Sequence, residues 1–425
     1  MEIDWTTRQL QRYAEEGQYA ISYMAKHETD EYFLERVLDL LRTYVEGLTH
    51  VSKDPASARI IVRLALVSYY KVQTRGYWAR IVRLWPSIYD LAEWMNDFAA
   101  QAELMKETAV VKSNQGDWAG AMELFRYLLH HPRFVTLSPN QRADILFQTG
   151  VTFIQIAQYR QAYNVLMQCR AIALRFDGSE EPRRMNEHDG QPDVFRIEPP
   201  LWELHAYTLD QLGNIAMIQG QIEEARYYYQ KYLDMLLQHG QEDDLACAAY
   251  QSLGRLWLFV DRFDEAIPLL EKGLEIRRKL QEKQGITTSL LYLAMAYVET
   301  GRLYQAEMLI DEAFILAKEL QMIGGIAFAH LVAGSLEAKR GRMEAAIVQW
   351  KQVMAILDTH SLPTIGLPTV KALLLALVRT RQIGELASTL ISVLRILRRQ
   401  RIGLVAYLRW TFQILRINQM LRIRK

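Results

Sequence analysis

The stretch LGRLW at Leu253–Trp257, followed by DRFDEA at Asp261–Ala266, decides the fold of this chain. The first part is typical of one face of a helix, and the second of a turn that opens the next helix. Gly254 and Ala266 place small side chains where the two helices cross, so their backbones can approach closely. The stretch therefore predicts a helical hairpin.

The same hairpin pattern recurs at intervals of about forty residues. A small residue and, twelve positions later, an alanine mark each unit, and turn glycines separate its helices. The recurring positions are Gly254, Ala294 and Gly334, then Ala225, Ala266, Ala306 and Ala346, with Gly301 and Gly341 at the turns. Self-similarity on this scale is typical of a chain built by stacking one supersecondary unit. The pattern predicts an all-α solenoid of helical hairpins.

The spacing of these residues closely resembles the tetratricopeptide repeat, whose usual period is 34 residues. Units of about forty residues resemble the sensor repeats of MalT-like signal-transduction ATPases. The resemblance implies a right-handed superhelix with a concave groove that binds other molecules. Because the chain lacks a nucleotide-binding motif and a helix-turn-helix, it implies only the sensing or scaffolding half of such a protein.

The register of the repeats divides the chain into five parts. We expect N-terminal capping helices in 1–58, with helices near 4–25 and 30–47, and repeats in 59–175 and 201–385. The 63-residue interval from Ala162 to Ala225 places an acidic, Gly- and Pro-containing insertion at 176–200, predicted to be an exposed loop. Its role stays open between partner contact and a tolerated insertion. Basic capping helices are predicted in 386–425.

Composition limits the classes of function. The 425 residues carry a formal net charge of +1, so the whole chain has no general attraction for nucleic acid or anionic membranes. Cys169 and Cys247 are the two cysteines, which argues against a disulfide framework and favours a reducing, cytoplasmic location. The first residues lack the order of a secretory signal, and no apolar run is long enough to span a bilayer.

Motifs for catalysis are absent from the sequence. It contains no P-loop, no G-x-G-x-x-G, no H-E-x-x-H and no G-x-S-x-G. His130 and His131 are adjacent on a predicted helix and point in different directions, which makes a poor metal site. We therefore expect no catalytic residues, no metal and no cofactor.

Candidate binding residues come from the tetratricopeptide resemblance, in which four first-helix positions of each unit line the groove. On this chain the resemblance places there Tyr207, Asp210, Asn214, Met217, Gln251, Arg255, Leu258, Leu291 and Met295. Polar residues concentrate in the earlier units and apolar ones in the later units. The complement is a peptide or protein segment with a charged or amide-rich part followed by an apolar part. The alternative is that these side chains only solvate the groove or pack on a neighbouring helix.

The C-terminal forty residues carry the strongest charge asymmetry. They hold nine basic residues and no acidic one, which leaves the rest of the chain with a formal charge of −8. The predicted basic patch consists of Arg395, Arg398, Arg399, Arg401, Arg409 and Arg416. An amphipathic helix here would cap the last repeat. Its other face, with Trp410, Ile414, Ile417 and Leu421, is too apolar for a fully solvated cap.

Two functions follow from these patterns. The favoured one is a non-enzymatic interaction or sensor scaffold with a protein or peptide partner in the groove. The alternative is a ligand-responsive regulator that engages nucleic acid or a membrane surface through the basic end. Nucleic acid and a membrane are the less favoured partners. Nucleic acid is the weaker candidate, because motifs for base stacking and groove reading are missing. The excess apolar surface of the C-terminal helix also allows a homo-oligomer.

Overall fold

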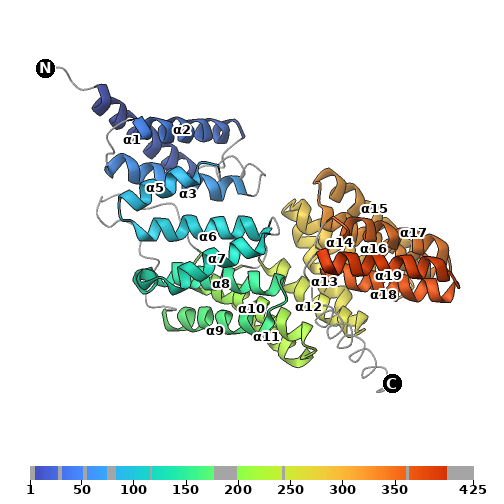
Figure 1. Cartoon of the computed structure of the whole chain (residues 1–425). Helices are drawn as coiled ribbons and strands as arrows, with labels where there is room; N and C mark the ends of the chain where they lie inside the picture. Colours follow the sequence, from blue (N-terminus) through green and yellow to red (C-terminus); the bar gives the residue numbers. More distant parts are fainter. Residues whose placement is uncertain are drawn as a thin grey trace. The chain divides into compact units, whose positions relative to one another are not determined.

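A computed structural model describes residues 5–26, 31–50, 55–73, 83–114, 117–176, 199–241, 245–359 and 363–399. In these ranges the regular structure is helical, with one short 3-10 helix at Pro132–Thr136. The chain divides into two compact units, Met1–Thr208 and Leu209–Lys425, and Figure 1 labels their helices. The predicted all-α class is confirmed, and the hairpins of each unit follow one another as in an α-solenoid.

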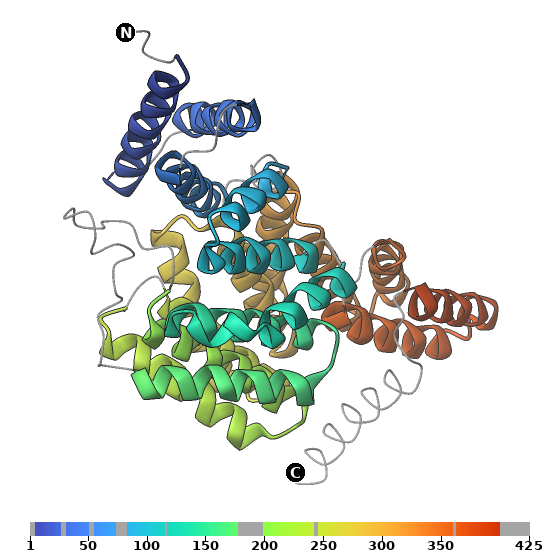
Figure 2. The same cartoon turned by 60° about the vertical axis from the view of Figure 1, so that its left-hand side comes forward.

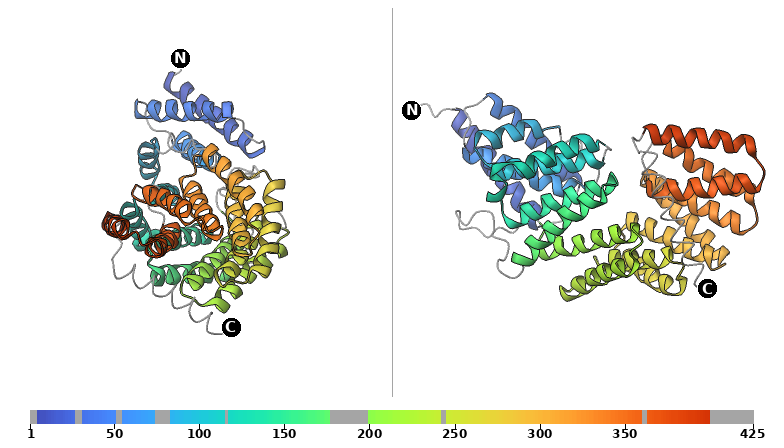
Figure 3. Two further views of the ribbon diagram at one scale, coloured as in Figure 1. Left: turned by 90° about the vertical axis from the view of Figure 1, so that its right-hand side faces the viewer. Right: turned by 60° about the horizontal axis from the view of Figure 1, so that its bottom comes forward.

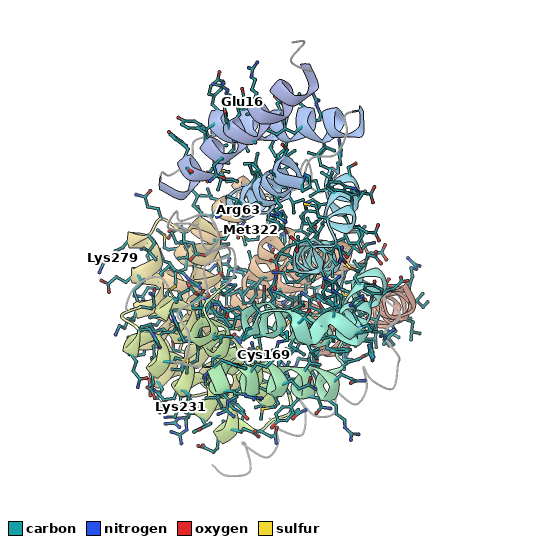
Figure 4. The ribbon with its side chains drawn as sticks, turned by 90° about the vertical axis from the view of Figure 1, so that its left-hand side faces the viewer. Glu16, Arg63, Cys169, Lys231, Lys279 and Met322 are labelled. Atoms are coloured by element: carbon teal, nitrogen blue, oxygen red, sulfur yellow. The ribbon has the colours of Figure 1, made fainter. Side chains whose placement is uncertain are left out.

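The first unit begins with four helices around one apolar core. These are α1 (Trp5–Lys26), α2 (Glu31–His50), α3 (Pro55–Gln73) and α5 (Trp85–Trp94). Helix α3 packs against the other three, as Figure 2 shows in blue. The Tyr44 hydroxyl of α2 donates a 2.8 Å hydrogen bond to Glu16 of α1, which is labelled in Figure 4. Helices near 4–25 and 30–47 were expected, and both are present.

Two hairpins follow in the first unit. They are α6 (Phe98–Asn114) with α7 (Trp118–His130), and α8 (Pro139–Gln155) with α9 (Tyr159–Phe176). The N-terminus of α8 has a complete capping box, in which Ser138 and Gln141 each bond the other's backbone N–H. Asp117 caps α7 by accepting a bond from the Gly120 N–H. Local sequence thus fixes where these helices start.

The second unit consists of regular hairpins, with α10 crossing from the first unit into it. The hairpins are α10 (Leu201–Ile218) with α11 (Ile222–Gln238), α12 (Ala246–Phe259) with α13 (Phe263–Lys279), α14 (Lys283–Glu299) with α15 (Leu303–Glu319), α16 (Ile323–Lys339) with α17 (Met343–Leu357), and α18 (Pro363–Arg379) with α19 (Ile383–Arg399). From α12 onward each helix packs on the next one (Figure 3). The start of α14, α16 and α18 at forty-residue steps reproduces the predicted period.

Turn residues with positive φ separate the two helices of a hairpin. Gly301 and Gly341 take φ values of 79° and 80°, as predicted for glycines that end a first helix. Asp261 and Arg381 adopt the same left-handed region at φ 60° and 57° in their own hairpins. The turn geometry is therefore common to the repeats even where glycine is absent.

Small residues lie at the helix crossings, as predicted. A Cβ added to Gly254 would lie 2.7 Å from Leu270, and one added to Gly213 would lie 2.5 Å from Tyr229. Ala266 is fully buried at its crossing. Each small side chain thus leaves room for a large one on the partner helix, which sets the spacing of the hairpin.

Candidate functional site

A connected polar cluster joins α10, α11 and α12 in the second unit. It consists of Asp210, Asn214, Tyr229, Ser252 and Arg255, and we call it the Asp210/Arg255 cluster. The Asn214 Oδ1 atom accepts hydrogen bonds from the Tyr229 hydroxyl, at 2.9 Å, and from the Arg255 guanidinium. The Asp210 carboxylate accepts from Ser252 Oγ at 2.7 Å and from Asn214 Nδ2 at 3.2 Å. Three predicted binding residues, from two successive first helices, therefore meet in one network.

The charges of this cluster are partly withdrawn from water. Burial raises the pKa of Asp210, against the opposing effect of the nearby Arg255 and of the hydrogen bonds from Ser252 and Asn214. Burial lowers the pKa of Arg255, but Tyr229, Tyr292 and Asp210 outweigh it and raise the pKa overall. The guanidinium therefore stays charged, and the Asp210 carboxyl group is the acidic neighbour that faces it.

One hydrogen-bond donor of the cluster, the Nε–H group of Arg255, has no acceptor among the described protein atoms. Within the described ranges, Arg255 Nε is buried and has no hydrogen-bond partner. A buried N–H without an acceptor costs about 1–3 kcal/mol.

Gln251 lies in a second polar network, which links α12 to α13 and α14. Its amide oxygen accepts from Arg277 and, at 3.2 Å, from the Ser289 hydroxyl. The same Arg277 Nη1 atom lies 2.9 Å from the Gly285 carbonyl and from Ser289 Oγ. The Gln251 side chain thus already has protein partners, which leaves its amide nitrogen as the group available for a ligand.

The other predicted residues differ in exposure. Met217, Leu258 and Met295 are half-buried, and the Met217 sulfur lies 4.0 Å from the Tyr229 hydroxyl. Leu291 is completely buried in the core of the second unit, so it offers no surface to a ligand in this conformation. Its predicted place in the groove lining is not supported, because neighbouring helices cover this position.

Tyr207 belongs to the first unit. Its hydroxyl donates to Glu203 at 2.8 Å, and its ring centroid lies 6.1 Å from that of Phe147. Burial, together with the Glu203 carboxylate, raises the pKa of Tyr207. The residue thus has partners of its own within that unit.

Sequence reasoning missed two members of the cluster. The ring of Tyr229, four positions after Ala225, is fully buried against the crossing glycine Gly213, and its hydroxyl also joins the polar network. The sequence signal that could have indicated this polar role is the tyrosine hydroxyl at a repeat position where other units have the apolar Leu270 or Ile310. Ser252 carried no such signal, because a serine two residues before a crossing is ordinary in a helix.

A buried ionic cluster in the first unit was also missed. Lys106 Nζ lies 2.5 Å from Glu103, 2.9 Å from Glu107 and 2.5 Å from Asp144, and all four side chains are nearly inaccessible to solvent. Burial raises the pKa of Glu103, against the attraction of Lys106. Three carboxyl groups around one ammonium favour retention of a proton by Glu103. The cluster ties α6 to α8.

The predicted basic patch is only partly described. Arg395 is exposed on α19, whereas the side chains of Arg398 and Arg399, and all of Arg401, Arg409 and Arg416, lie outside the described residues. Residues 177–198 of the predicted acidic loop also lie outside them. Over the described ranges, no helix has the length and apolarity to cross a membrane, and no group of three His, Cys, Asp or Glu residues is suited to a metal ion.

Comparisons with known proteins identify the repeat. The family model of the tetratricopeptide repeat matches residues 204–279, the segment that contains the Asp210/Arg255 cluster. A search of curated proteins gives no significant match. The resemblance predicted from the spacing is thus confirmed for this segment, which is similar to the tetratricopeptide repeat.

Solved structures with the same fold cover most of the chain. A Rap protein complexed with competence and sporulation factor is 11% identical, with 93% of this chain and 99% of that chain covered and a TM-score of 0.60. The Rap conjugation gene regulator of plasmid pLS20 in complex with the Phr* peptide is 11% identical, with 92% and 96% covered and a TM-score of 0.54. A signal-transduction ATPase with a tetratricopeptide sensor from Pyrococcus horikoshii is 12% identical, with 88% and 54% covered and a TM-score of 0.48. The two Rap proteins, with TM-scores above 0.5, share the fold of this chain, and an identity of 11% shows the fold alone.

Proposed function

We propose that this chain is a non-enzymatic interaction or sensor scaffold that binds a peptide or protein segment along the first helices α10, α12 and α14. The observation that carries the proposal is the Asp210/Arg255 cluster, in which predicted binding residues of successive repeats meet. Tetratricopeptide-like proteins bind through surfaces assembled from several repeats. A cluster shared by two repeats is therefore a natural contact for a segment that crosses both.

The chemistry of the cluster defines the ligand group. Arg255 is held by Asn214 and Tyr229 and keeps one buried N–H unused by the described protein atoms. A backbone carbonyl or a carboxylate oxygen of the ligand supplies the missing acceptor once the side chains that cover Arg255 Nε move aside on binding. Leu258, on the next turn of α12, and Met295, at the repeat position of Arg255 on α14, are half-buried and provide apolar contacts for the ligand. The ligand is a segment with an oxygen acceptor next to apolar side chains.

Proteins of the same fold support this use. A Rap protein binds competence and sporulation factor, and the pLS20 Rap regulator binds the Phr* peptide. Their likeness to this chain is one of fold, so ligand identity is not transferred. The shared architecture supports a peptide-binding role at the level of class.

We also propose a cytoplasmic location. Cys169 and Cys247 are both buried, and they are not joined in a disulfide. Free thiols persist in reducing compartments, whereas secreted proteins generally use cysteine pairs for disulfides.

The test selects ligands without assuming their identity. A random peptide library is panned against the intact chain, and the affinity of recovered peptides is measured for three proteins. These are the wild type, an Asp210→Asn/Arg255→Met double variant that removes both charges together, and Arg226→Met. Arg226 is an exposed arginine of α11 that pairs with nearby Glu223, so it is a matched control.

We expect the double variant to weaken binding about ten- to a hundred-fold, because a hydrogen bond to a charged group is worth about 1.5–3 kcal/mol. Arg226→Met should leave affinity unchanged. Circular dichroism and thermal unfolding establish that both variants fold. Recovery of no peptide above background, or equal affinity for all three proteins, contradicts the proposal.

A further inference from the structure

One exposed position of the second helices is apolar in successive repeats of the second unit. It stands two residues after the crossing alanine, about 200° further around the helix, so its side chain points away from the first helix of the same hairpin. All the residues at this position are exposed, and Figure 1 labels their helices. They are Tyr227 on α11, Pro268 on α13, Met308 on α15 and Val348 on α17, and we call them the outer stripe.

Packing within a repeat does not require an apolar residue at this position. Its occupants in three other hairpins are polar and equally exposed, namely Glu123 on α7, Asn164 on α9 and Ser388 on α19. Tyr227, Met308 and Val348 are 52%, 56% and 55% exposed. Isolated apolar residues are ordinary on a protein surface, but a series of them on adjacent repeats marks a contact surface.

The outer stripe is widest on α15. Tyr304 lies one turn before Met308 and Ile315 two turns after it on the same helix face, and they are 73% and 67% exposed. Neighbouring second helices also lie within side-chain reach of each other, since Arg278 of α13 and Glu312 of α15 form a 2.7 Å ion pair. The stripe residues of successive repeats therefore belong to one surface.

Negative charge borders the outer stripe on the side of the helix N-termini. One turn before the stripe residue stand Glu223 on α11, Asp264 on α13 and Glu344 on α17. Acidic residues are common in first turns because they interact favourably with the helix dipole. Among the described residues, Asp264 and Glu344 form no ion pair, so their charge is available to a partner with a basic flank.

The spacing of the stripe favours a helical partner. Packed helices lie about 8–10 Å apart, so neighbouring stripe residues are separated by about one such step. Residues seven positions apart on an α-helix share a face and lie about 10.5 Å apart. Residues on one face of an extended strand lie about 7 Å or about 13 Å apart, which fits this step less well.

We propose that the outer stripe binds an amphipathic α-helix of a partner protein. Its apolar residues recur every seven positions, and its lysine or arginine residues face the acidic side of the stripe. Four stripe residues span about 30 Å, which corresponds to about 20 residues of helix. This surface lies on the second helices, so it is separate from the proposed groove on the first helices and does not depend on it.

A display library of helices about 21 residues long tests the proposal on the intact chain. Apolar residues are fixed at every seventh position, and the other positions vary among charged and polar residues. A second library fixes apolar residues at every second position, as in a strand. Affinities of the recovered peptides are measured for the wild type, for Met308→Glu/Val348→Glu, and for the matched control Val135→Glu/Leu174→Glu. The control changes two residues of the first unit that are 71% and 52% exposed.

We expect binders from the heptad library, with lysine or arginine enriched on one flank, and an affinity about ten-fold or more lower for Met308→Glu/Val348→Glu. The control and the groove variant Asp210→Asn/Arg255→Met should bind these helices as the wild type does. Circular dichroism establishes that each variant folds.

Several results would overturn the proposal. These are the absence of binders from the heptad library, stronger binders from the strand library, enrichment of acidic residues, or equal affinity for the wild type and the stripe variant. Sedimentation that shows a dimeric wild type and a monomeric Met308→Glu/Val348→Glu would also overturn it, because a second copy of the chain would then occupy the stripe.

Discussion

Replacing Gly334 by alanine will overpack the crossing of α16 and α17. The new Cβ atom would lie 2.3 Å from Trp350 Nε1 and 2.6 Å from its Cδ1 atom. The indole is almost fully buried, and its Nε1 donates a 3.2 Å hydrogen bond to the Leu331 carbonyl. The ring therefore cannot retreat without losing that bond.

The structure sets the size of the effect. Overpacking a tight core costs about 1–3 kcal/mol, and loss of the indole hydrogen bond adds about 1 kcal/mol. Alanine is favoured over glycine within a helix by about 1 kcal/mol, which offsets part of the cost. We expect the free energy of unfolding to fall by about 1–3 kcal/mol. Urea denaturation followed by far-UV circular dichroism measures this change.

The neighbouring repeat provides a rescue. There Ala294 faces the smaller Ile310, so alanine and isoleucine fill one crossing without conflict. A Gly334→Ala/Trp350→Ile double variant recreates this pair and should regain most of the lost stability. The reasoning is refuted if Gly334→Ala is as stable as the wild type, or if the double variant is no more stable than Gly334→Ala alone.

Three further predictions concern other buried positions. Because burial raises the pKa of Glu103, its ionisation lowers the free energy of unfolding as the pH rises above the unfolded-state pKa of about 4.3. Glu103→Gln should therefore be more stable than the wild type at pH 8 but not at pH 4, and a stability difference independent of pH in thermal unfolding would contradict this. Ala266→Trp should destabilise by about 1–3 kcal/mol or more, since Ala266 is fully buried, and an unchanged melting temperature would undermine the repeat register. Burial raises the pKa of Cys169, which is labelled in Figure 4, to about 12. A thiol reagent at pH 8 should therefore modify Cys169 only after denaturation, and rapid modification of the folded protein would contradict its burial.

The fold was predictable because its determinants repeat. Each helix crossing is marked by a small residue, such as Gly254 or Gly334, and by an alanine twelve positions later. Because three or more copies of this pair occur, the pattern is unlike a chance match. The turn at Asp261 carries no glycine, yet the period still locates it. Periodicity thus predicts helices, turns and crossings without knowledge of side-chain conformation.

The candidate site was predictable only in part. Repeat position indicates the helix face on which Asp210, Arg255 or Leu291 lies, but not how far a neighbouring helix covers it. Leu291 is buried for that reason, although it shares its repeat position with half-buried Gln251. A hydrogen bond between repeats, such as that between Asp210 and Ser252, depends on the lengths and conformations of side chains on two helices. The repeat pattern in the sequence therefore does not predict it.

The Lys106 cluster shows the same limit of sequence reasoning. Glu103 and Lys106 are one turn apart, which is an ordinary surface pair on a helix. Only Asp144, 38 residues later, and the packing of α6 on α8 turn that pair into a buried ionic cluster. A charged residue in a helix thus reveals its burial only through contacts with the next repeat.

The most direct test of the proposed function maps where a selected peptide lies. A library-selected peptide with a photoreactive side chain beside its acceptor group is cross-linked to the intact wild-type chain, and the labelled residues are identified by mass spectrometry. The account predicts labels on first helices, at Met217, Leu258 or Met295. Labels confined to second helices, such as α13 or α15, would contradict it.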